Sequence, residues 1–475
     1  MISMKTSNVK FRALIIPLII GISFWLCTPV RPTGVSVTAW HMLSIFLATI
    51  IACITQPLPI AGVALTGFTI MILLRVTDFE TAITAFSNKT VWLIAMAYMI
   101  SRGFAKTGLG KRIALLFVKH FGQKTLGLSY AIEAIDLVTS PATPSNTARA
   151  GGIIYPIIKS LSEVFNSNPK DKTERKIGSY LIFSEFHANI VTSAMFMTAM
   201  APNLIAIGLA NSFGIKISWM EWFIAALLPG IICLLTVPFI IYKLYPPEIK
   251  ETPNAKKWAE KQLATMGHIS KRELSMLFIF IIALLLWMFS SILNLDATLV
   301  GFIAVLLLLF TSVLSVDDVL KEKGSWNVII WFSVLIFMAN ELNTLGFIPW
   351  LSKTISHAMS GMGWITVLII ISIIYFYSHY FFASQAAHVT AMYSALLGVA
   401  IAAGVPGKLA ALMLAFVTAI YASSTQYANG PASVLFGSNY ISQKHWWSLN
   451  FAMGIYYLII WLGVGMVWTN VIGIW

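Results

Sequence analysis

Short polar clusters interrupt this apolar chain at four places, and their side chains suit the binding of carboxylate oxygens. Two clusters join apolar segments that have no loop between them, and these joins hold Ser145, Asn146, Thr147, Ser384, Gln385 and Ala386. Two more interrupt long apolar segments, and these breaks hold Thr198, Pro202, Asn203, Thr425, Asn429, Gly430 and Pro431. Hydroxyl and amide groups donate hydrogen bonds without a formal charge, and helix N-termini add free N–H groups and a positive dipole. We therefore predict an anion site here; the alternative is that these side chains only cap helices.

Two ionisable residues, Arg149 and His388, stand close behind the joins. Each follows the serine of its join by four residues. An ionisable residue within a membrane is costly and is a candidate for function by default. Because arginine stays protonated and histidine takes either form, we predict fixed positive charge behind the anion site. The alternatives are an ion pair of Arg149 with Asp136 or Glu133, and a neutral His388 bonded to backbone.

The two joins predict re-entrant hairpins. The first would consist of segments 125–143 and 146–159, and the second of segments 363–382 and 386–403. Each pair of segments meets at a polar stretch that is too short to form a loop. Irregular backbone at membrane depth is tolerated only where protein or a water-filled cavity surrounds it.

The two breaks predict discontinuous helices. Segments 180–212 and 409–441 are both apolar and longer than the roughly 20 residues that cross a bilayer. Each contains a proline, which removes a helix donor and clashes with the preceding turn. The chain therefore brings four helix interruptions to membrane depth.

These features occur twice in the same order, so the chain contains an internal repeat. Gly108 in the first copy matches Gly346 in the second, and a hairpin and a broken helix follow each of them. The predicted divisions are a first helix with the N-terminus (1–38), a first repeat (39–243), a cytoplasmic loop (244–272) and a second repeat (273–475). Repeats with discontinuous helices are typical of secondary transporters, whose substrate lies near the bilayer midplane.

The composition predicts an all-α polytopic membrane protein. Of 475 residues, 58% are hydrophobic and 10% are charged, against roughly 25% charged in soluble proteins. We predict about 11 transmembrane helices and two re-entrant hairpins, the first helix following Lys5, Lys10 and Arg12 as a retained span. With a cytoplasmic N-terminus, 23 of the 31 Lys and Arg residues lie inside and seven outside, as the positive-inside rule requires. This topology explains most of the +13 charge, makes the repeats inverted and predicts a plasma-membrane location.

Other classes of function find no support in the residues. Cys27, Cys53 and Cys233 lie in apolar runs without the spacing of a metal site or a disulfide framework. No basic stripe interleaved with aromatics indicates nucleic-acid binding. Without a nucleophile–base pair or metal cluster we expect no enzyme, no catalytic residue, no metal and no cofactor.

The stretch from Thr143 to Arg149 resembles the first Ser-Asn-Thr signature of the divalent-anion/sodium symporter superfamily. The stretch from Tyr380 to Val389 and that from Gly430 to Gly437 are similar to one branch: bacterial citrate/succinate and tartrate/succinate antiporters and plastid 2-oxoglutarate/malate translocators. The resemblance covers nearly the whole chain. It implies a homodimer, a scaffold domain, a transport domain that moves as an elevator, and substrate carboxylates bound at both joins.

Two departures from the superfamily pattern bear on coupling. The second signature is Ser384-Gln385-Ala386, and sodium-coupled members usually have uncharged residues where this chain has Arg149 and His388. Fixed cations there would replace sodium, and an empty charged carrier would resist crossing the membrane. We therefore predict sodium-independent exchange of 2-oxoglutarate, malate, fumarate or succinate, with citrate and tartrate as further candidates. The alternatives are a sodium- or proton-coupled dicarboxylate symporter of the same fold, and an anion channel or membrane enzyme.

Overall fold

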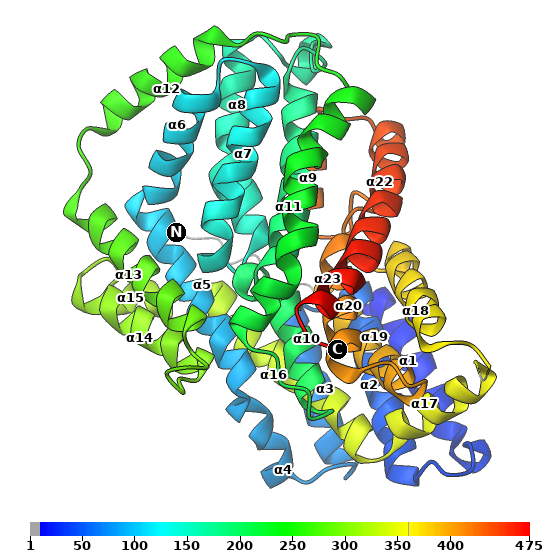
Figure 1. The fold of residues 1–475 in the computed structure, drawn as a ribbon. Coiled ribbons are helices and arrows are strands. Elements are labelled where there is room, and N and C mark those ends of the chain that lie inside the picture. The colour runs from blue at the N-terminus through cyan, green and yellow to red at the C-terminus, as the bar shows by residue number, and fades with distance from the viewer. Residues whose placement is uncertain (1–9, 360) are drawn as a thin grey trace.

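The computed structural model of the chain describes residues 10–359 and 361–475 as a set of helices joined by turns (Figure 1). Lys5, on which part of the predicted cytoplasmic N-terminus rests, lies outside these residues. Within them no strand occurs, which confirms the all-α class. Among the described residues, six helices are long and apolar enough to cross a membrane, seven if the bent pair Phe79–Ser87 and Lys89–Thr107 is one span. Four shorter apolar helices add to these, so the chain is a multi-pass membrane protein; the figure of about 11 spans stays a prediction.

The order of elements in residues 37–244 recurs in residues 271–471. The first run consists of α2 (Val37–Thr55), α3 (Ile60–Leu73), α4 (Phe79–Ile83), α5 (Lys89–Thr107), α6 (Leu109–Phe121), α7 (Thr125–Thr139), α8 (Tyr155–Val164), α9 (Gly178–Met195), α10 (Ala201–Asn211) and α11 (Trp219–Leu244). The second consists of α13 (Lys271–Met288), α14 (Ala297–Phe310), α15 (Val316–Leu320), α16 (Lys323–Thr344), α17 (Phe347–Ala358), α18 (Trp364–Ser378), α19 (Gln385–Ala402), α20 (Gly407–Ile420), α21 (Gly430–Phe436), α22 (Gln443–Leu458) and α23 (Gly465–Val471). The opposite orientation of the two runs in the membrane stays a prediction.

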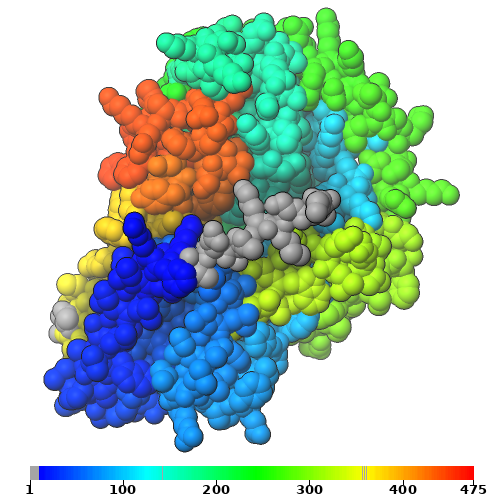
Figure 2. Space-filling view, turned by 180° about the vertical axis from the view of Figure 1, so that it is seen from behind, coloured from blue at the N-terminus to red at the C-terminus, as the bar shows by residue number. Residues whose placement is uncertain are grey.

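The two runs interlock rather than standing apart. Helix α3 packs on α16, α5 on α14, and α10 on α19, so each contact joins one run to the other. Figure 2 shows one of these contact regions, in which residues of the first run with numbers below 100 lie beside residues of the second run with numbers above 300. Two helices lie outside the repeat: α1 (Phe11–Leu26) packs on α2, and α12 (Pro253–Met266), within the predicted cytoplasmic loop, packs on α6.

The hairpins have the predicted bounds to within a few residues. In the first, α7 continues as a short 3₁₀ turn, Ser140–Ala142, and the returning arm begins as a π-helical segment, Ala148–Ile154, before α8. In the second, α18 continues as a 3₁₀ turn, His379–Phe381, and the returning arm is α19. π-Helical segments occur mostly as single turns and frequently at functional sites.

The discontinuous helices are also present, and each break comes just before its proline. Helix α9 ends at Met195 and α10 begins at Ala201, while α20 ends at Ile420 and α21 begins at Gly430. Pro202 and Pro431 thus lie in the first turns of α10 and α21. A proline is tolerated there because that N–H has no partner within the helix in any case. The prolines therefore mark where each helix restarts.

Two glycines turn the chain at equivalent points of the two runs. Gly108 (φ 77°) separates α5 from α6, and Gly346 (φ 89°) separates α16 from α17. Left-handed backbone of this kind is accessible to glycine without a steric penalty. Both short helices that follow carry an apolar stripe along one side and polar residues along the other.

Replacing Gly346 by alanine should destabilise the protein by about 1 kcal/mol, because left-handed backbone costs L-residues roughly 1–2 kcal/mol. An added Cβ would have no neighbour within 4 Å, so the cost would come from the backbone alone. The matched control is Gly463→Ala, whose Cβ also meets nothing but whose backbone is helical. Thermal unfolding in detergent should show a lower Tm for Gly346→Ala only. Equal Tm values for the two variants would refute this explanation.

Candidate functional site

A cavity of about 240 Å³ lies where both hairpin joins meet both helix breaks. Its lining residues are Tyr98, Pro144, Ser145, Asn146, Thr147, Ala201, Pro202, Gly324, Asn327, Val328, Trp331, Ala383, Ser384, Gln385, Ala386, Asn429 and Gly430. None of these side chains carries a formal charge, whereas hydroxyl and amide groups are frequent. All six residues predicted at the joins line the cavity, together with Pro202, Asn429 and Gly430 from the breaks.

The two join serines cap the arms that follow them and still have a hydrogen to donate. Ser145 Oγ accepts from the N–H of Ala148 at 3.2 Å, and Ser384 Oγ accepts from the N–H of Ala387 at 3.3 Å. A hydroxyl that accepts a hydrogen bond keeps its own O–H as a donor. Both serines are half-buried. Capping and ligand binding are therefore compatible roles for the same side chain.

The Gln385 side chain ties both hairpins to the second break. Its Oε1 accepts from Asn146 Nδ2 at 3.4 Å and from Asn429 Nδ2 at 3.2 Å. Its Nε2 donates to the carbonyl oxygen of Thr418 at 3.1 Å, on α20. A shorter asparagine at this position would place its amide nearer its own backbone. The departure from the family signature thus supplies a contact between the two repeats.

The first join and the second break approach each other at Gly430. A Cβ on Gly430 would lie 2.9 Å from both Cβ and Cγ2 of Thr147, and close to its Oγ1 as well. A branched side chain has few rotamers with which to relieve such a clash. Only glycine allows the two chain segments to form this edge of the cavity.

Arg149 is fully buried behind the first join, and each of its guanidinium nitrogens is bonded. Nε donates to Asp136 Oδ1 at 3.0 Å, and one Nη donates to the carbonyl oxygens of Thr143 at 2.6 Å and Ala199 at 2.5 Å. The other Nη donates to Ser193 Oγ at 2.9 Å. The ion pair with Asp136 is therefore formed. The guanidinium also joins the end of the first hairpin arm to the first helix break.

Asp136 is itself held by the helix that precedes the break. It accepts from Asn189 Nδ2 at 3.3 Å and from the hydroxyl of Thr192. Asn189 Nδ2 lies 3.3 Å from the carbonyl oxygen of Asn146 as well. A buried ion pair is stable only when further hydrogen bonds satisfy its remaining atoms, and this network supplies them. It fixes the backbone that presents Asn146 to the cavity.

Behind the second join the equivalent backbone contact is made by His379, to which the sequence assigned no role. His379 Nε2 lies 3.0 Å from the carbonyl oxygen of Ala428, in the second break, and its Nδ1 lies 3.0 Å from Nδ1 of His388. Nε2 of His388 lies 2.9 Å from Ser378 Oγ. His388, the repeat mate of Arg149, thus contacts another side chain rather than the break.

Four predicted binding residues lie outside the cavity lining and are buried. Thr198 donates to the carbonyl oxygen of Pro141 at 2.6 Å, and Asn203 donates to the carbonyl oxygens of Ser193 and Phe196. Thr425 has a buried hydroxyl without a partner, and Pro431 lies in the first turn of α21. Thr198 and Asn203 hold the first break in shape. Their role toward a ligand stays a prediction.

Part of the cavity lining comes from α5 and α16, which the sequence alone did not indicate. Tyr98 comes from α5, and Asn327 and Trp331 come from α16. These side chains lie in apolar helices without a break or proline, so nothing local separates them from side chains that face lipid. Each of these residues carries a polar group within an apolar run. Only the packing of the helices shows that this group faces the cavity.

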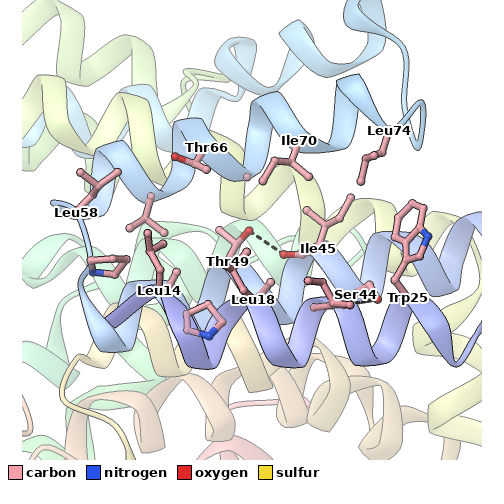
Figure 3. A pocket seen from close by; sticks show the side chains of 18 of the residues that line it. Leu14, Leu18, Trp25, Ser44, Ile45, Thr49, Leu58, Thr66, Ile70 and Leu74 are labelled. Carbon is pink, nitrogen blue, oxygen red and sulfur yellow. Dashed lines mark hydrogen bonds between the residues drawn. The ribbon is translucent and has the colours of Figure 1, made fainter. Parts of the chain in front are cut away.

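A larger cavity, of about 360 Å³, lies between α1, α2 and α3 and has an apolar lining (Figure 3). The hydroxyls in its walls donate to backbone carbonyl oxygens: Thr49 Oγ1 to Ile45 O at 2.8 Å, Thr66 Oγ1 to Gly62 O at 2.8 Å, and Ser44 Oγ to Gly21 O at 3.2 Å. No charged side chain is part of its lining. Of these two cavities, the one at the joins is the better candidate for an anion site.

Comparison with known proteins identifies the family of the chain. Residues 8–475 match the family described as sodium:sulfate symporter transmembrane region. YflS of Bacillus subtilis (strain 168), provisionally named a malate transporter, is 48% identical over 99% of this chain and 98% of its own length. The L-tartrate/succinate antiporter of Escherichia coli O157:H7 is 36% identical over 93% of this chain and 94% of its own.

A solved structure shares the fold. The YdaH transporter of Alcanivorax borkumensis superposes with a TM-score of 0.58 at 11% identity, covering 86% of this chain and 97% of its own. At this identity the likeness concerns the fold alone. It places the present helices in a known transporter architecture.

Replacing Gly430 by alanine should weaken binding of succinate by about tenfold or more, because overpacking costs about 1–3 kcal/mol. The new methyl group would push Thr147 away from the second break. Gly152→Ala is the matched control, since its Cβ would have no neighbour within 4 Å. Isothermal titration calorimetry measures the Kd of each variant for succinate. Equal affinities would show that this approach does not shape the site.

Proposed function

The chain belongs to the sodium:sulfate symporter family, and from that premise we propose that it is a secondary transporter exchanging dicarboxylates without sodium. Malate, succinate, fumarate and 2-oxoglutarate are the expected substrates, with tartrate and citrate as further candidates. The relatives named above are a protein provisionally named a malate transporter and a tartrate/succinate antiporter. Malate, tartrate and succinate, the substrates in these names, are all dicarboxylates. The observation that carries the proposal is a cavity whose walls come from both hairpin joins and both breaks.

Two donor clusters, one from each hairpin join, line the same cavity and suit a molecule with two carboxylates. The first cluster is Ser145, Asn146 and Thr147, at the start of the π-helical segment, and the second is Ser384 with the N-terminus of α19. Each carboxylate would receive hydroxyl and backbone N–H donors at a helix N-terminus. A monocarboxylate would leave one cluster without a partner, at the cost of an unsatisfied buried polar group.

Arg149 supports sodium independence through its position. Its guanidinium donates to two carbonyl oxygens from two chain interruptions, Thr143 and Ala199. Carbonyl oxygens of unwound helices coordinate sodium in other transporters, and here a covalently attached cation meets them. Asp136 balances the formal charge of Arg149, so the guanidinium acts as a permanent local substitute for a cation. Such a cation cannot be released after each cycle.

Exchange follows if only the loaded carrier crosses the membrane. In the empty state, helix N-termini and free donors around the cavity would face the hydrocarbon without an anion. We propose that a transport domain with the hairpins and broken helices moves as an elevator against a scaffold that includes α5 and α16. The working form would be a homodimer in the plasma membrane, with a cytoplasmic N-terminus.

Uptake of labelled succinate into proteoliposomes tests the exchange mechanism. We expect uptake only when the vesicles are preloaded with unlabelled dicarboxylate, and at the same rate with and without a sodium gradient. A panel of internal substrates would rank the preferences. Sodium-dependent uptake into empty vesicles would instead establish a symporter.

Arg149→Ala should abolish most exchange, because it removes the contact between hairpin and break. It also leaves Asp136 buried and unpaired, a loss of about 3–5 kcal/mol. The Arg149→Ala/Asp136→Ala double variant removes that unpaired charge and should recover Tm without recovering exchange. Initial exchange rates at equal protein content, with Tm measured beside them, separate the two effects. Wild-type exchange by the double variant would refute the role of the guanidinium.

A further inference from the structure

We propose that His379 and His388 form a single proton-binding site, and that this site takes up a proton when a dicarboxylate binds. The inference rests on the proposed function, because it assigns a second ligand to the same transport cycle. It is carried by the hydrogen-bond geometry of the pair, in which each ring nitrogen has a partner within 3.0 Å.

The positions of most protons in the pair follow from what each partner can do. A carbonyl oxygen only accepts, so Nε2 of His379 must carry a hydrogen toward Ala428. The two Nδ1 atoms, 3.0 Å apart, can share only one hydrogen, because one of them must accept. In the neutral pair, His379 already holds its one proton on Nε2, so the shared hydrogen belongs to His388.

One position then remains open, Nε2 of His388. Without a hydrogen it accepts from the hydroxyl of Ser378 at 2.9 Å; with a hydrogen it donates to that hydroxyl. In the second case the Ser378 hydroxyl turns to the carbonyl oxygen of Tyr375, also 2.9 Å away. Met392 Sδ lies 3.2 Å from the same nitrogen and accepts weakly. The pair therefore holds zero or one added proton, and rotation of one hydroxyl satisfies either state.

The surroundings accommodate a positive charge without a carboxylate. The rings of Tyr421 and Phe382 stack on the pair, with centroids 4.0 Å from His379 and 4.3 Å from His388, and Tyr375 lies beside His388. Cations are attracted to aromatic faces. Tyr375 and Tyr421 are the titratable neighbours. No Asp, Glu, Lys or Arg shares a hydrogen bond or ring contact with the pair in residues 10–359 and 361–475.

The missing counter-charge is then the substrate itself. His388 lies one helical turn beyond Ser384, whose join lines the cavity. A dianion at that join favours the protonated pair. By linkage, protonation favours the dianion by the same free energy. Each bound dicarboxylate thus brings a proton with it, and exchange of one dicarboxylate for another moves no net proton.

The two repeats would hence use different cations at equivalent places. Ala199 and Ala428 lie in the first and second breaks, and the carbonyl oxygen of each faces a cationic or ionisable side chain. In the first repeat this is Arg149, whose charge is permanent. In the second it is a histidine pair, whose charge follows pH and substrate occupancy.

Calorimetric titration of the purified protein with fumarate, at pH 7 in two buffers of different ionisation enthalpy, tests the proposal. The dependence of the apparent enthalpy on the buffer gives the number of protons taken up on binding. We expect a value between zero and one for the wild type, and none for His379→Gln or His388→Gln. His187→Gln is the matched control, since His187 is a buried histidine that bonds to Tyr457 instead, and it should retain wild-type uptake.

The wild type alone provides a second measurement if a variant fails to fold. Its Kd for fumarate should fall as pH is lowered from 8 to 6, by at most about tenfold per pH unit, the limit for one linked proton. Fumarate binding with no proton uptake and a constant Kd would overturn the histidine proposal and leave exchange intact. Uptake that persists in both folded histidine variants would overturn it too. Absence of binding by any dicarboxylate would contradict the proposed function, and the histidine proposal with it.

Discussion

The guanidinium of Arg149 bonds to backbone from two interruptions of the fold at once, the end of the first hairpin arm and the first helix break. Backbone that leaves the helix at membrane depth loses its internal partners, and hydrocarbon supplies none. The interruptions are therefore stable only where side chains bond to the exposed groups. Arg149 does this in the first repeat and His379 in the second. The cavity exists because these buried side chains hold the two hairpin joins and the two helix breaks close to one another and away from the lipid.

The site is formed between the repeats as well as within them. Gln385 bonds to Asn146 and Asn429, and Gly430 allows Thr147 to approach. Each repeat contributes hydrogen-bond donors to the cavity lining, so neither repeat alone would form the site. The repeats are similar in the order and length of their elements, yet they differ in the residues that hold their breaks. Under the histidine proposal, that asymmetry would give the two repeats different electrostatic behaviour.

Much of the architecture could be predicted from the sequence, because polar residues inside apolar segments are rare and costly. Both hairpins, both broken helices and the six join residues followed from that rule. The rest depended on packing between distant elements. Tyr98 and Asn327 lie in unbroken helices, so only the fold shows that they face the cavity. His379 was missed because it lies near the end of its apolar segment, where a polar residue needs no special explanation. The Arg149–Asp136 pair was one of two open alternatives, and only the geometry could select it.

The central claim is that one dicarboxylate spans the space between the two hairpin joins. A cryo-electron microscopy structure of the protein in lipid nanodiscs with saturating succinate tests it most directly. The account predicts ligand density in the 240 Å³ cavity, with one carboxylate within hydrogen-bond distance of Ser145–Thr147 and the other near Ser384. Density at any other site, with this cavity unoccupied at saturating succinate, would contradict it.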